Sequence, residues 1–240
     1  MTIRFVGTRY HGSQVQKNAY TVQAEFQRAL QKVLGTLPDI KCCSRTDAGV
    51  HANKFCISFR HGTRQNTTRL LMALNANLAD DIRVTECTEM GESFHARYSA
   101  CAKRYIYKVY NSRIMDPFLR GLAAQFIPHI DEKELDDIAK VFLGTHDFRA
   151  FCSKKTAAED TVRTVSDISV IRDGELVIFS ITADGFLYNM ARAMVGTLFN
   201  AARGRLGRGD IAARLESGKR DNLIATAPAE GLYLDEVFYS

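Results

Sequence analysis

The sequence lacks the features of several protein classes. No apolar run approaches the roughly 20 residues that span a bilayer, so we expect no membrane protein. The first residues do not follow the basic-then-apolar order of a signal peptide. The six cysteines form no C-x-x-C pair and have no histidine at the spacing of zinc ligands, which predicts no metal site. Reduced cysteines in a cytoplasmic protein are the expectation.

The composition is otherwise that of a globular protein. The 240 residues are 46% hydrophobic and 25% charged, enough for one large domain or two halves of roughly 100–150 residues. The net charge of +5 is unevenly distributed: residues 1–70 hold eleven Lys and Arg against three Asp and Glu, and residues 131–175 hold seven against eleven. This distribution predicts a basic, nucleic-acid-binding surface in the N-terminal part. An ordinary solvated surface is the alternative.

Hydrophobic periodicity predicts both helices and strands. A helix is expected over 22–34, with Thr21 as its N-cap and Gly35 as its stop. Further helices are expected over 67–77 and 187–203, and one opens at the capping box Asp131-Glu132-Lys133-Glu134 and is ended by Gly144. Strands are expected over 40–43, 55–59, 82–87, 100–110 and 232–239. Asp173-Gly174 between two alternating runs predicts a hairpin with a type I′ turn. Because helices and strands do not strictly alternate, the pattern favours an α+β fold with mostly antiparallel sheets. We divide it into two halves, 1–97 and 98–240.

The polar loop over 44–53 holds the most informative residues. Asp47 lies between two predicted strands beside Ala48 and Gly49, and Arg45 stands two positions before it. Small neighbours let another backbone or a planar ligand approach closely, and a nearby arginine would keep the carboxylate ionised. These features suit a nucleophile or a base better than a general acid. A carboxylate that only stabilises its own turn is the alternative. An aspartic protease does not fit, because its dyad needs two such turns.

Several motifs, taken together, resemble the tRNA pseudouridine synthase A family. The resemblance rests on these segments, which run in order along almost the whole chain: Gly7-Thr8-Arg9-Tyr10-His11-Gly12, Arg45-Thr46-Asp47-Ala48-Gly49-Val50-His51-Ala52, Leu74-Asn75-Ala76-Asn77-Leu78, Phe94-His95-Ala96-Arg97-Tyr98, Arg104-Tyr105-Ile106-Tyr107, Gly185-Phe186-Leu187-Tyr188-Asn189-Met190, Met194-Val195-Gly196-Thr197 and Ala227-Pro228-Ala229-Glu230-Gly231-Leu232. The chain departs from the family pattern at Val6, Ser13, Ser44 and Ala191. Ser13 stands where the family usually has Trp, which this chain lacks entirely.

The resemblance implies the pseudouridine synthase fold, with two similar halves, extended antiparallel sheets flanked by helices, and a cleft between them. It implies that uridine in RNA becomes pseudouridine without metal or cofactor. By resemblance Asp47 is the catalytic aspartate and Tyr105 stacks on the uracil. Arg45 fills the space that the flipped base leaves, Arg192 pairs with Asp47, and Leu232 packs beside the base.

The family also implies the partners. It is homodimeric and cytoplasmic, and it acts on uridines 38, 39 and 40 in the anticodon stem-loop of tRNA. Five basic residues of the N-terminal part are candidates for phosphate contacts: Arg9, Lys17, Arg28, Lys41 and Lys54. Two alternatives stay open. One is a paralogue that modifies another tRNA site or ribosomal RNA, and the other is a catalytically silent RNA-binding module.

Overall fold

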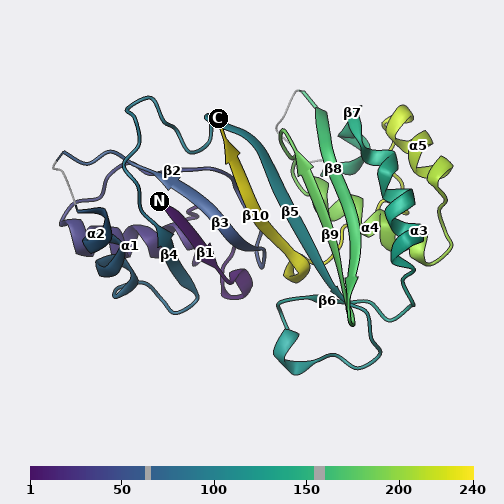
Figure 1. Ribbon diagram of the computed structural model, residues 1–240, viewed down its shortest axis with the longest axis horizontal. Coiled ribbons are helices and arrows are strands. Elements are labelled where there is room, and N and C mark those ends of the chain that lie inside the picture. The colour runs from purple at the N-terminus through teal and green to yellow at the C-terminus, as the bar shows by residue number, and fades with distance from the viewer. Residues whose placement is uncertain (63–65, 154–159) are drawn as a thin grey trace. The chain divides into compact units, whose positions relative to one another are not determined.

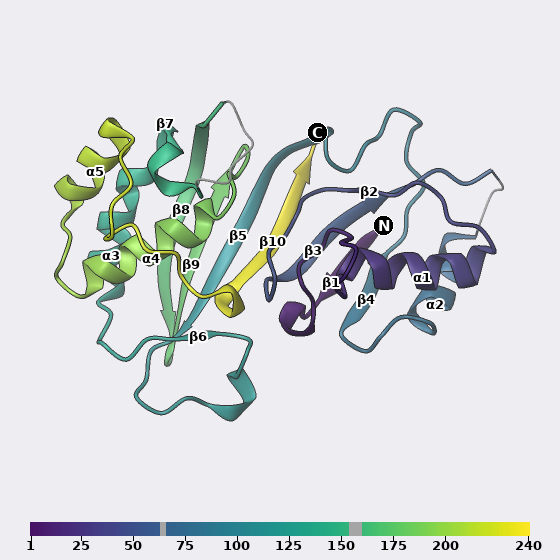
Figure 2. The same cartoon turned by 180° about the vertical axis from the view of Figure 1, so that it is seen from behind.

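The protein folds into two compact units, shown from two sides in Figures 1 and 2. The computed structural model describes residues 1–62, 66–153 and 160–240. One unit comprises Met1–Cys101 and Tyr233–Ser240, and the other comprises Ala102–Leu232. The sequence division into 1–97 and 98–240 differs from these units at the C-terminus. The final strand returns to the first unit, because the main chain of Tyr233 and Leu234 pairs with that of His51 and Ala52.

The first unit is a sheet with two helices. Its strands follow the order β4 (Ile82–Glu86), β1 (Thr2–Phe5), β3 (His51–Ser58) and β10 (Leu232–Tyr239), and the short β2 (Lys41–Cys42) also pairs with β3. The pairing of β10 with β3 is parallel and the other pairings are antiparallel. In Figure 1 the yellow β10 runs beside the blue β3. Helix α1 (Val22–Leu34) packs against α2 (Thr67–Asn75), which packs against β4.

Helix α1 confirms its sequence prediction at both ends. The Thr21 hydroxyl accepts a hydrogen bond from the Ala24 amide at 3.3 Å, which satisfies one of the free donors at the helix start. Gly35 ends the helix in the left-handed conformation, with φ +73°. Phe26 and Leu30 on the apolar face are fully buried. Local signals therefore fix this helix before any packing is considered.

The second unit is a mostly antiparallel sheet with three helices. Its strands follow the order β5 (Ala100–Tyr110), β9 (Leu176–Ala183), β8 (Val162–Asp173) and β7 (Gly144–Asp147), and β6 (Ala124–Gln125) pairs with β5 in parallel. The helices are α3 (Glu132–Ala139), α4 (Met190–Ala202) and α5 (Arg208–Ser217). In Figure 2, α4 lies in front of β8 and β9, and α3 lies beside β8, against which it packs. The α+β class with mostly antiparallel pairing is confirmed, whereas β1, β7 and α5 are elements that the periodicity does not predict.

Two local predictions need correction. In the hairpin, Asp173 pairs with Leu176, so the two turn residues are Gly174 and Glu175 and not Asp173-Gly174. Only Gly174 of the pair has a positive φ, of +58°, which is the pattern of a type II′ turn rather than type I′. The helix expected from residue 187 begins only at Met190, because Asn189 lies in the left-handed region with φ +66°.

Other boundaries shift by a few residues. Strand β3 begins at His51, within the span predicted as a loop, and α3 continues as a 3₁₀ turn over Lys140–Phe142. All six cysteines are free thiols. Among the residues that the structure describes, no helix has the length and apolarity needed to cross a membrane.

Candidate active site

The carboxylate of Asp47 is carried on a tight turn between β2 and β3. The amide of Val50 donates to the carbonyl of Asp47 at 3.2 Å, and Gly49 occupies the third position of the turn with φ +79°. A positive φ at that position is the requirement of a type II turn, which explains the glycine. Asp47 is partly exposed, Arg45 and Ala48 are exposed, and Thr46 is buried. Buried Thr46 therefore anchors the loop, while Arg45 and Asp47 on either side of it are accessible to solvent.

A second segment of the first unit holds this loop by hydrogen bonds. The amide of Ser13 donates to the carbonyl of Thr46 at 3.1 Å, and the amide of Thr46 donates to the Ser13 hydroxyl at 2.8 Å. The amide of Gly49 donates to the carbonyl of Tyr10 at 3.2 Å. Ser13, noted in the sequence as a departure from the family pattern, is thus a direct support of the loop that carries Asp47.

Two glycines allow the two segments to approach this closely. A Cβ atom on Gly7 would lie 1.9 Å from the carbonyl oxygen of Val50, and the Gly7 amide donates to Nδ1 of His51 at 3.0 Å. A Cβ atom on Gly12 would lie 2.6 Å from the carbonyl oxygen of Thr46, and Gly12 also has φ +88°. Both positions exclude any side chain. The glycines of the N-terminal motif therefore serve the Asp47 loop, 35 to 40 residues further along the chain.

In the second unit, Tyr105 and Tyr107 lie on one face of β5, whose burial alternates along the strand. Both are buried, and the Tyr105 ring meets Phe186 edge-on with centroids 4.8 Å apart. The hydroxyl of Tyr107 donates to the carbonyl of Pro228 at 2.8 Å, and burial raises the pKa of that hydroxyl. Tyr107 is thus a core residue, and Phe186 sets the orientation of the Tyr105 ring.

Arg192 lies on α4, and its guanidinium is oriented by two neighbours. Its Nε donates to the carbonyl of Ala227 at 2.7 Å, and a terminal nitrogen donates to Oδ1 of Asn189 at 3.2 Å. The amide of Ala227 donates in return to the carbonyl of Arg192 at 3.0 Å. A charged side chain in an apolar helix is costly unless its donors are hydrogen-bonded, and these contacts satisfy part of the Arg192 guanidinium. A pairing with Asp47 remains a prediction.

One turn along α4, Gly196 lets the segment before Leu232 pack against the helix. A Cβ atom there would lie 2.2 Å from the carbonyl oxygen of Ala225. Gly196 thus leaves room for residues 225–227, and the hydrogen bonds between Arg192 and Ala227 hold this segment against the helix. Leu232, at the start of β10, is 6% exposed.

A family model described as tRNA pseudouridine synthase matches residues 1–99 and 138–240. The chain belongs to the tRNA pseudouridine synthase family. It is 44% identical over 239 residues to tRNA pseudouridine synthase A of Acetivibrio thermocellus, covering 100% of this chain and 98% of the relative. It is 39% identical over 237 residues to tRNA pseudouridine synthase A of Staphylococcus aureus strain MRSA252, covering 98% of this chain and 89% of the relative.

A comparison with solved structures finds a crystal structure of a Cbf5–Nop10–Gar1 complex. The match has a TM-score of 0.38 and 11% identity, and it covers 83% of this chain and 53% of the other. The family model and the relatives therefore carry the assignment. Members of this family are isomerases, which makes the present chain an enzyme, as predicted.

Most of the basic residues that were candidates for RNA contacts in this synthase already have acidic partners. Four of them form ion pairs within the first unit: Arg9–Asp81 at 2.7 Å, Arg28–Glu25 at 2.6 Å, Lys41–Asp39 at 2.6 Å and Lys54–Glu236 at 2.6 Å. Lys17 is exposed. A phosphate at any of the four pairs would have to compete with a carboxylate. Two of these carboxylates, Asp81 and Glu236, lie outside residues 1–70, so the charge count over that range overstates the cationic surface available to RNA.

The candidate residues that the sequence predicts for the synthase are divided between the two units. Arg45 and Asp47 share one loop of the first unit, and Tyr105, Arg192 and Leu232 belong to the second. Sequence reasoning missed Ser13 as a support, and it missed Asp81, which contacts Arg9 and Tyr10. The glycines at 7 and 12 offered a signal, because glycine in a motif often marks a close backbone approach. Nothing in the local sequence marks Asp81.

Proposed function

We propose that this synthase isomerises uridine to pseudouridine at positions 38, 39 and 40 of the tRNA anticodon stem-loop, with Asp47 as the catalytic aspartate. The observation that carries the proposal is the full-length similarity to relatives named tRNA pseudouridine synthase A. In the reaction the N1–C1′ bond breaks, the uracil turns, and C5 bonds to C1′. The proton from C5 is lost and N1 gains one, so nothing is oxidised or hydrolysed.

The loop geometry supports the roles proposed for Asp47 and Arg45. A stacked uridine hides the atoms that react, so it must be flipped out of the helix at a cost of a few kcal/mol. Arg45 is exposed on the same loop as Asp47, two residues away, where its side chain is free to enter the space that the base leaves. Asp47 then acts on the base, on C1′ or on a sugar proton.

In the second unit, the proposed roles follow from how the side chains are held. Tyr105 stacks on the uracil, with Phe186 fixing its ring from the side. Arg192 holds the Asp47 carboxylate, and its remaining donors are kept in place by Ala227 and Asn189. Leu232 packs beside the base. Metal and cofactor are not required by any of these roles.

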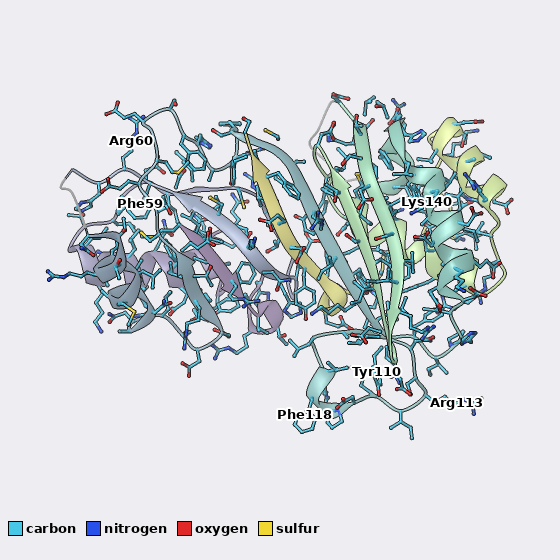
Figure 3. All side chains as sticks on the ribbon, viewed as in Figure 1. Phe59, Arg60, Tyr110, Arg113, Phe118 and Lys140 are labelled. Atoms are coloured by element: carbon cyan, nitrogen blue, oxygen red, sulfur yellow. The ribbon has the colours of Figure 1, made fainter. Side chains whose placement is uncertain are left out.

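We further propose a cytoplasmic homodimer. The free thiols of all six cysteines fit a reducing compartment. Apolar surface for a second copy is offered by Ile114 and Phe118, which are 82% and 88% exposed on the loop between β5 and β6. Figure 3 shows Phe118, with Arg113, pointing away from the strands. Ile114 and Phe118 are the two most exposed of the large apolar side chains that the structure describes, and exposed apolar patches are typical of interaction surfaces.

Mapping pseudouridine in the RNA of a strain that lacks this synthase tests the site of modification. We expect loss of pseudouridine at tRNA positions 38 to 40 alone, restored by the wild-type gene and not by an Asp47→Asn version. Loss at another tRNA position or in ribosomal RNA would establish a paralogous activity instead. No loss anywhere, with tRNA binding retained, would indicate a silent binding module.

Sedimentation of the purified protein tests the homodimer. Wild-type protein is expected to have twice the monomer mass, and the double variant Ile114→Ser with Phe118→Ser is expected to be monomeric, because it removes the apolar contact. The matched control is Met72→Ser, which alters a side chain that is 64% exposed on the first unit and should leave the mass unchanged. A monomeric wild-type protein would overturn the proposal.

A further inference from the structure

We propose that Asp81 is a positioning residue that holds the Asp47 loop in its working conformation through Tyr10. The inference rests on the proposed catalytic role of Asp47. It assigns a function to a carboxylate that lies outside the motif of the loop and that the sequence does not single out.

Asp81 binds the N-terminal segment at three points. Its Oδ1 accepts a hydrogen bond from the Tyr10 hydroxyl at 2.6 Å, and its Oδ2 accepts one from Nε of Arg9 at 2.7 Å. Its main-chain carbonyl accepts from the amide of Val6 at 2.9 Å. The Asp81 side chain is 17% exposed, and it immediately precedes β4, whose Ile82 is fully buried. The adjoining strand β4 therefore fixes the position of the Asp81 carboxylate, which in turn anchors Arg9 and Tyr10.

Tyr10 transmits this anchor to the loop. Its side chain is 2% exposed, and its ring stacks on Tyr20 with centroids 5.0 Å apart. Its main-chain carbonyl accepts the amide of Gly49, the third residue of the turn that Asp47 begins. Asp81 thus holds the side-chain hydroxyl of Tyr10, and the main-chain carbonyl of Tyr10 holds the loop through the amide of Gly49.

The charges strengthen the contact between Asp81 and Tyr10. Burial of Asp81 opposes ionisation, but hydrogen bonds from Arg9 and Tyr10 lower its pKa below the usual value. Burial, followed by the hydrogen bond to Asp81, raises the pKa of Tyr10. At neutral pH the pair is an ionised carboxylate that accepts from a protonated phenol, and hydrogen bonds of this charge-assisted kind are short and strong.

Precise placement matters because a catalytic group displaced by about 1 Å can lose about a hundredfold in rate. The N-terminal segment supports the Asp47 turn at two places: the carbonyl of Tyr10 accepts from the amide of Gly49, and Ser13 bonds to the main chain of Thr46. Loosening Tyr10 would let the turn move while the sheet beneath it stays intact. The effect should therefore appear in kcat rather than in tRNA binding.

The test compares Asp81→Asn and Tyr10→Phe with the control Asp80→Asn. Asp80 is the neighbouring residue, fully exposed and paired on the surface with Arg83 at 2.8 Å. Asp81→Asn and Tyr10→Phe are expected to lower kcat about tenfold or more with KM for tRNA within about twofold, and to be less than additive in combination. Asp80→Asn should change neither constant.

Amide hydrogen exchange gives a second readout that does not depend on catalysis. In both variants the Gly49 amide should exchange faster, while amides of β3 keep their protection, because only the turn is released. The inference is overturned if Gly49 exchange and kcat stay at wild-type values, or if all amides of the first unit lose protection together. If Gly49 exchanges faster and Asp47→Asn proves fully active, the relay stands and the catalytic assignment of Asp47 fails.

Discussion

Replacing Asp47 by Asn is expected to lower kcat for pseudouridine formation by at least about a thousandfold, in the range lost when a positioned catalytic group is removed. The amide keeps the shape of the carboxylate but cannot attack carbon or take up a proton at neutral pH. Asp47→Ala should be equally inactive. Release of tritium from C5-labelled uridine in tRNA measures the reaction, because the C5 hydrogen leaves when C5 bonds to C1′.

The matched control for this prediction is Asp39→Asn, which removes an exposed carboxylate paired with Lys41 in the same part of the chain. It should retain full activity. Binding of tRNA should persist in Asp47→Asn, since the change leaves the backbone of the turn in place. An active Asp47→Ala protein would refute the assignment of the catalytic aspartate.

The second large effect is expected from Gly7→Ala. The new Cβ would lie 1.9 Å from the carbonyl oxygen of Val50 and 2.6 Å from its carbonyl carbon, so the backbone of one segment must move. We expect a loss of about 3 kcal/mol in the free energy of unfolding, near the upper end of the usual cost of overpacking. The displaced loop should also lose about a hundredfold in kcat. Denaturant unfolding and the tritium assay measure the two quantities.

Gly91→Ala is the comparison for this substitution, because a Cβ atom on Gly91 meets nothing within 4 Å and its φ is not positive. That variant should match wild-type protein in both stability and activity. Equal behaviour of the two alanine variants would show that the close approach of Gly7 to Val50 does not support the loop.

The sequence predicts those parts of the fold whose causes are local. Helix α1 has its cap, its apolar stripe and its terminating glycine within fifteen residues, and the structure reproduces its bounds. Strand β10 is predicted as a strand but not as part of the first unit, because alternation reports burial and not the partner. The hairpin turn is displaced by one residue for a similar reason: the pairing of Asp173 with Leu176 decides the register.

The site divides in the same way. The motif identifies Asp47 and Arg45, and Gly49 is explained by the turn it must adopt. Asp81 cannot be found from local sequence, since it meets Arg9 across 72 positions. Likewise, a charge count over residues 1–70 counts Arg9 and Lys54 as cationic surface, whereas Asp81 and Glu236, both outside that range, pair with them. Partners distant in sequence decide these outcomes.

Incubation of the purified protein with an unmodified tRNA transcript, followed by mapping of pseudouridine at single-nucleotide resolution, tests the central claim most directly. Transcripts carrying uridine singly at position 38, 39 or 40 should each gain pseudouridine at that position, and none should gain it with the Asp47→Asn protein. Transcripts that stay unmodified, or that gain pseudouridine only outside the anticodon stem-loop, would contradict the account.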